Sequence, residues 1–90
     1  MHGIIVTLED EVASTSEAPE TFEDVAFEAR LPDGSTVRGN AYDIEVFGTM
    51  TIAWWTRDDV PLTHPHIERA VRQRVIASID AWFATKEAAQ

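Results

Sequence analysis

The chain contains no cysteine among its 90 residues. This absence excludes a disulfide scaffold, a thiolate metal centre and a cysteine nucleophile. Because small secreted domains usually depend on disulfides, the composition favours a reducing compartment, and we expect a cytoplasmic protein. Glycine is also scarce: the four glycines are dispersed, so no phosphate-binding loop is formed, and no serine stands in a G-x-S-x-G nucleophile elbow. We therefore expect a protein that is not an enzyme and needs no cofactor.

Long hydrophobic runs and basic residues are missing as well. No apolar run approaches the length that spans a bilayer, and the first residues lack the basic and apolar regions of a signal peptide. Residues 1–63 hold 13 Asp and Glu against three Arg, whereas residues 64–90 hold three acids against four basic residues, so charges of −10 and +1 give the net −9. Such a balance argues against nucleic acid and membrane partners and is compatible with a basic protein partner.

Alternating apolar residues predict an antiparallel sheet of three to four strands. Residues 3–8 form a β-branched run, residues 25–31 alternate, and Pro32-Asp33-Gly34-Ser35 predicts a tight turn into a hairpin. We expect Gly39-Asn40 to interrupt the return strand as a bulge or a tight bend, and the strand to resume over residues 41–47. A reversal at residues 47–49 then leads into the strand of residues 50–56.

One amphipathic helix follows, from about residue 63 to about Lys86. At 100° per residue, one side of this segment is apolar over about half the circumference, which indicates a helix lying flat on one face of the sheet. The residues of that side are Ile67, Val71, Val75, Ile79 and Trp82, flanked by Ile76 and Phe83. Opposite them we expect sheet residues Val25, Phe27, Leu31, Tyr42, Ile44, Val46, Met50, Ile52 and Trp54. The fold class is therefore α+β in a single domain, residues 1–90.

Residues 9–20 differ from the rest of the chain. They carry Glu9-Asp10-Glu11, few apolar residues and Pro19. Such a stretch has little apolar surface with which to offset the entropy of ordering, and we predict a flexible acidic loop.

Adjacent Trp54 and Trp55 suggest where a binding surface lies. Alternation along a strand directs Trp54 towards the helix and Trp55 towards the open face. A Trp beside a Phe, surrounded by carboxylates, is typical of a protein-binding surface. The candidate partner-binding residues are Trp55, Phe47, Glu45, Asp43 and Glu28. Two alternatives stay open: the N-terminal strand or the acidic loop covers Trp55, or Trp55 only marks the end of its strand.

A metal site is the remaining chemical possibility. His64 and His66 stand near Asp59, and two histidines with one carboxylate can hold zinc, so a metal-dependent enzyme centred on these residues is the outlying third hypothesis. No motif such as H-E-x-x-H accompanies them. We interpret the histidines as polar residues of a helix N-terminus and expect no metal.

The order of strands followed by a helix that contains Ile79-Asp80-Ala81-Trp82-Phe83 is similar to antitoxins of the HicB type, although the Gly- and Pro-rich segment of that family is missing. The order is also similar to the last part of a double-stranded RNA-binding domain. Residues 64–69 replace the lysine cluster of that family, which argues against RNA binding. The first hypothesis is a protein-interaction module, monomeric or weakly dimeric, acting through the open sheet face or an edge strand. The alternative is an antitoxin-like or inhibitor protein whose acids neutralise a basic partner.

Overall fold

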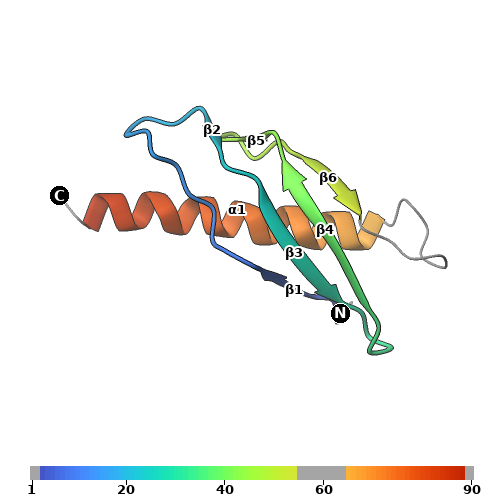
Figure 1. Ribbon diagram of the computed structural model, residues 1–90. Helices are drawn as coiled ribbons and strands as arrows, with labels where there is room; N and C mark the ends of the chain where they lie inside the picture. Colours follow the sequence, from blue (N-terminus) through green and yellow to red (C-terminus); the bar gives the residue numbers. More distant parts are fainter. Residues whose placement is uncertain (1–2, 55–64, 89–90) are drawn as a thin grey trace.

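The computed structural model describes residues 3–54 and 65–88, with the side chains of Trp54 and Ala88 excepted. A four-stranded antiparallel sheet packs on one long helix, and a two-stranded sheet lies beside it (Figure 1). The larger sheet has the order β1-β3-β4-β6, with strands β1 (Ile5–Leu8), β3 (Val25–Arg30), β4 (Thr36–Tyr42) and β6 (Thr51–Trp54). The smaller sheet pairs β2 (Thr21–Phe22) with β5 (Ile44–Glu45), and the helix is α1 (Pro65–Ala88). The predicted α+β fold class is confirmed.

The helix packs with the face that its periodicity predicts. Ile67, Val71, Val75 and Ile79 are buried, and the flanking Ile76, Trp82 and Phe83 are half-buried. Glu68 in the first turn and Lys86 in the last turn both complement the helix dipole. Within the described residues, no helix combines the length and hydropathy needed to cross a membrane.

The sheet meets this helix through alternate residues of its strands. Val25, Phe27 and Ala29 of β3 are buried, as are Val37 and Ala41 of β4. The turn after β3 forms as predicted, because Leu31 N–H donates to the Ser35 carbonyl and Asp33 accepts a hydrogen bond from Ser35 N–H.

Asp43 changes which residues of the following segment are buried. Its φ of 51° is the left-handed conformation that Asp tolerates better than most residues, and it ends β4. Ala41 and Ile44 are therefore both fully buried although they are three residues apart. The prediction of one continuous strand over residues 41–47 was wrong, and half-buried Tyr42, which pairs with exposed Thr51, does not belong to the buried core.

Gly39 lies inside β4 without interrupting it. The strand pairs continuously from Thr36 to Tyr42, so the predicted bulge at Gly39-Asn40 is not formed. A Cβ on Gly39 would stand 2.1 Å from the carbonyl oxygen of Ala53 and 2.9 Å from the Phe27 ring. The glycine therefore permits close packing at the centre of the sheet.

The small sheet covers the C-terminal half of α1, which extends past the large sheet (Figure 1). Phe22 of β2 is buried, and its ring centroid lies 5.5 Å from that of Trp82 and 6.2 Å from that of Phe83, edge-to-face in both pairs. Such pairs contribute about 0.5–1.5 kcal/mol beyond the area that they bury. This aromatic cluster forms a second core next to the one beneath the large sheet.

Candidate interaction surface

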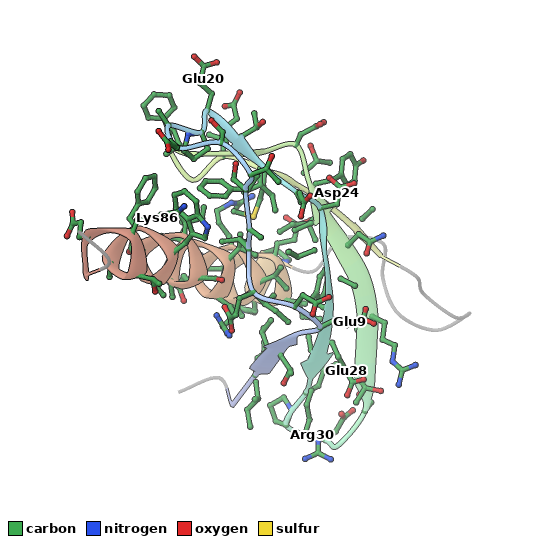
Figure 2. All side chains as sticks on the ribbon, turned by 60° about the vertical axis from the view of Figure 1, so that its left-hand side comes forward. Glu9, Glu20, Asp24, Glu28, Arg30 and Lys86 are labelled. Atoms are coloured by element: carbon green, nitrogen blue, oxygen red, sulfur yellow. The ribbon has the colours of Figure 1, made fainter. Side chains whose placement is uncertain are left out.

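The face of the large sheet that points away from α1 is formed by every second strand residue. Cross-strand partners place Ile5, Arg30 and Thr36 in one row of this open face and Thr7, Glu28 and Arg38 in the next. The remaining members are Ala26, Asn40, Tyr42, Thr51 and Ala53, all half-buried or exposed. Figure 2 shows Glu28 and Arg30 on the side of the strands away from the helix. Among the described residues, α1 thus covers one face of the sheet and leaves the other accessible.

A charge pair and a shallow depression mark the centre of the open face. Arg38 Nε donates to Glu28 Oε2 at 3.0 Å, and both side chains are largely exposed. A pair this exposed stabilises the fold by about 0.2–1 kcal/mol. Beside it lies a depression of about 420 Å³ lined by Thr7, Glu9, Ala26, Phe27, Glu28 and Arg38. The small Ala26 side chain leaves room that a residue of a partner can enter.

The open face is less acidic than the rest of the surface formed by residues 1–63. Its strand positions carry two of the three arginines of residues 1–63, Arg30 and Arg38, and the carboxylate of Glu28, while Glu9 lies beside the depression where β1 ends. Most acids gather along the border, where seven exposed carboxylates occur between residues 9 and 24. They are Glu9, Asp10, Glu11, Glu17, Glu20, Glu23 and Asp24. The surface is therefore nearly neutral at its centre and acidic along one side.

The structure separates the candidate residues that the sequence grouped. Glu28 lies on the open face as expected, but Asp43, Glu45 and Phe47 belong to the segment between β4 and β6, which leaves the large sheet to pair with β2. Phe47 is 89% exposed, in the turn closed by hydrogen bonds from Gly48 N–H to the Glu45 carbonyl and from Glu45 N–H to the Thr49 carbonyl. Trp55 falls outside the described residues.

The possible metal ligands are only partly described. His66 is exposed in the first turn of α1, and His64 and Asp59 lie outside the described residues. Among residues 3–54 and 65–88, no three His, Asp or Glu side chains come together as a metal site.

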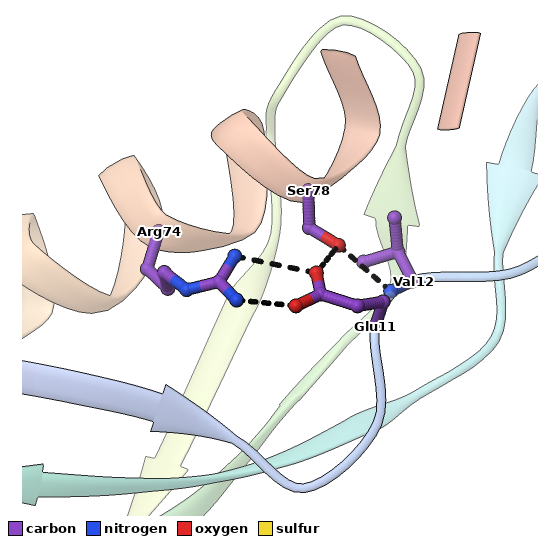
Figure 3. Close-up of polar contacts among 4 residues, drawn as sticks. All are labelled: Glu11, Val12, Arg74 and Ser78. Carbon is purple, nitrogen blue, oxygen red and sulfur yellow. Dashed lines mark hydrogen bonds and ion pairs between the residues drawn. The ribbon is translucent and has the colours of Figure 1, made fainter. Parts of the chain in front are cut away.

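A polar network that the sequence analysis missed fastens residues 9–20, here called the strap, to α1 (Figure 3). Arg74 donates two hydrogen bonds to the Glu11 carboxylate, which also accepts one from the Ser78 hydroxyl. Ser78 Oγ in turn accepts a hydrogen bond from Val12 N–H at 2.9 Å. Ser78 is 2% exposed, and a buried polar residue on an apolar helix face requires a partner, which is the signal that could have revealed the network.

The network affects the acidity of Glu11. Hydrogen bonds from Arg74 and then from Ser78 hold the pKa of its carboxyl below the ordinary value. Because the folded pKa is lower than the unfolded one, this contact stabilises the fold above the unfolded pKa and is lost as the pH falls through the folded pKa. Buried Val12 anchors the strap on its apolar side. We therefore expect the flexibility predicted for residues 9–20 to be greatest at residues 14–18.

Ser78→Ala should lower the free energy of unfolding by about 1–3 kcal/mol, because it leaves the buried Val12 N–H without an acceptor. Urea denaturation measures the change. The matched control is Ala77→Ser, which adds the same hydroxyl at the exposed neighbouring position and should alter stability by less than about 0.5 kcal/mol. Equal stability of Ser78→Ala and wild type would show that the strap is held by other contacts.

Comparison of the chain with models of protein families, with curated proteins and with solved structures finds no significant match.

Proposed function

We propose that this protein is a small interaction module that binds a protein partner on the open face of its large sheet. The observation that carries the proposal is the asymmetry of the sheet: α1 covers one face, while the described residues leave the other accessible. Protein-binding surfaces are enriched in Arg and depleted in Lys, Asp and Glu, and the open face carries Arg30 and Arg38 while most acids lie along its border.

The charges indicate what a partner should present. Arg30 and Arg38 suit a partner with carboxylates or carbonyl groups at the centre of its contact surface, whereas the acidic border favours basic residues at its periphery. The carboxylates accelerate encounter and select among partners, while contacts over Ala26, Tyr42 and Ala53 contribute most of the affinity.

Photo-crosslinking tests the proposal. A photoreactive phenylalanine analogue is introduced at Arg38 on the open face and, as a control, at Gln73 on the exposed side of α1. We expect a discrete adduct with another protein in cells from position 38 and none from position 73, and loss of the adduct when Thr51→Arg is added on the same face. Adducts from position 73 alone, or from neither position, would contradict binding through the sheet.

An alternative function rests on the acidic border. Figure 2 shows Glu20, Asp24 and Glu9 following one another along one side of the molecule, and all three are exposed. A row of carboxylates can imitate the phosphates of a nucleic acid and occupy a basic protein, as an antitoxin-like inhibitor would. The Glu28 and Glu11 carboxylates are paired with Arg38 and Arg74, so the imitation would depend on the border acids. In that case, adducts would come from position 20 rather than position 38.

A further inference from the structure

The outer edge of β1 offers unused backbone hydrogen-bonding groups. Glu9 N–H donates to the Ala26 carbonyl at 2.9 Å, so the backbone groups of Glu9 face β3. Because these directions alternate along an antiparallel strand, Ile5 and Thr7 also face β3, whereas Val6 and Leu8 direct their N–H and C=O groups outward. Figure 1 shows β1 at the border of the sheet, and no other described strand pairs with this edge.

Apart from its short length of four residues, this edge lacks the usual protection against pairing. Exposed edges commonly carry a lysine or other charge, a proline or a bulge, and residues 3–8 contain none of these. Ile5 on the same strand is 61% exposed and is one of two large hydrophobic residues with exposed side chains in the described chain. An uncharged β-branched strand with an exposed isoleucine is unusual in a protein of net charge −9.

We propose that β1 pairs with β1 of a second copy of this chain, antiparallel across a two-fold axis at Val6. This register joins the two large sheets into one eight-stranded sheet. Val6 then meets Val6 of the second copy, and Ile5 stands opposite Thr7 of the second copy. The two Ile5 side chains become diagonal neighbours on the open face, and each stands directly opposite the Thr7 side chain of the other copy.

The positions of the charged residues around β1 favour a second copy as the partner strand and favour the register with the two-fold axis at Val6. With the axis at Val6, residues 4–8 of one copy pair only with residues 4–8 of the other, and no charged residue enters the ladder. An axis at Thr7 would bring Glu9 opposite Ile5 and Asp10 opposite Ile4, which places carboxylates beside apolar side chains. The second copy of β1 is also short and uncharged over residues 4–8, so the two edges match each other in length and in charge.

Salt should strengthen this association. Each copy carries −9, and added ions screen the repulsion between the copies without weakening the uncharged contact itself. A basic partner on the acidic border would respond in the opposite direction, since its attraction would be screened. The sign of the salt effect therefore separates the second copy from a basic occupant.

The test is sedimentation of the complete chain from about 10 µM to about 1 mM at low and high salt. We expect reversible dimers that increase with concentration and salt. Val6→Pro removes an outward N–H but none of the bonds to β3, and Ile5→Lys adds a charge to the exposed edge. Each should raise the dissociation constant at least about tenfold. Ile5→Lys should leave the melting temperature near the wild-type value, whereas Val6→Pro also removes a half-buried side chain that packs against the core and should lower it. The control is Ile52→Pro, which alters the outward position of the opposite edge strand β6 and should leave the dimer intact.

Three results would overturn the pairing: a monomer throughout the range at high salt, dimers that persist in Ile5→Lys and Val6→Pro, or dimers abolished only by Ile52→Pro. Because Ile5 is exposed, Ile5→Lys stays informative even if the proline variant unfolds. Pairing through β1 uses the edge of the sheet, whereas Arg38 lies on the open face of β4, so crosslinking from position 38 tests the proposed function independently.

Discussion

Phe22→Ala is expected to lower the free energy of unfolding by about 3–5 kcal/mol, the range typical of a buried Phe. Phe22 is 6% exposed and contacts both Trp82 and Phe83 edge-to-face, so the substitution leaves a cavity in the second core. In a domain of this size the loss corresponds to a decrease in melting temperature of about 15–30 °C. Differential scanning calorimetry and urea denaturation measure it.

Phe47→Ala provides the matched control, because it makes the same substitution at a side chain that is 89% exposed. We expect a change of less than about 0.5 kcal/mol. Similar destabilisation in the two variants would mean that Phe47 packs on the protein. A mild effect of Phe22→Ala would mean that the small sheet does not hold the C-terminal half of α1.

Gly39→Ala should cost about 3 kcal/mol or more, at the upper end of the range for an overpacked core. The added methyl group would stand 2.1 Å from the Ala53 carbonyl oxygen, a backbone atom that can move only by separating β6 from β4. The expected result is a large loss of stability and faster hydrogen exchange at the amides of Thr51 and Ala53. Denaturation followed by NMR detects both effects.

Gly34→Ala distinguishes crowding from backbone strain. Gly34 has a φ of 89° and open space around the added Cβ, so alanine there should cost only about 1 kcal/mol. Equal stability of Gly34→Ala and Gly39→Ala would show that the Ala53 carbonyl of β6 does not crowd a side chain at position 39.

Much of the fold is predictable because its determinants are local. The apolar side of α1 follows from the spacing of Ile67, Val71 and Val75, and the β3–β4 hairpin follows from the turn chemistry of residues 32–35. The left-handed conformation of Asp43 was not predicted because it allows β5 to pair with β2, and β2 lies about twenty residues earlier in the sequence. Residue propensities read over a short stretch carry no information about so distant a partner strand.

The candidate surface was only partly predictable, for the same reason. Alternation placed Glu28 on the open face, since β3 is regular. It assigned Asp43, Glu45 and Phe47 to that face on the assumption of one uninterrupted strand. The change of direction at Asp43 instead places Glu45 in the small sheet and Phe47 in the turn that follows it. The contribution of Arg38 became visible only once the register of β3 with β4 was known.

The bond between Val12 and Ser78 joins residues 66 positions apart, which constrains how the chain folds during its synthesis. At about 5–20 residues per second, roughly 3–13 s pass between translation of the strap and translation of its docking site on the helix. During that interval the side chains of Leu8 and Val12, which are buried in the finished fold, have no helix to cover them. The carboxylates at Glu9, Asp10 and Glu11 follow the apolar stretch of residues 3–8 directly, where like charges disfavour association of unfolded chains. We therefore expect removal of these three charges to increase aggregation during synthesis or refolding more than it alters the stability of the folded protein.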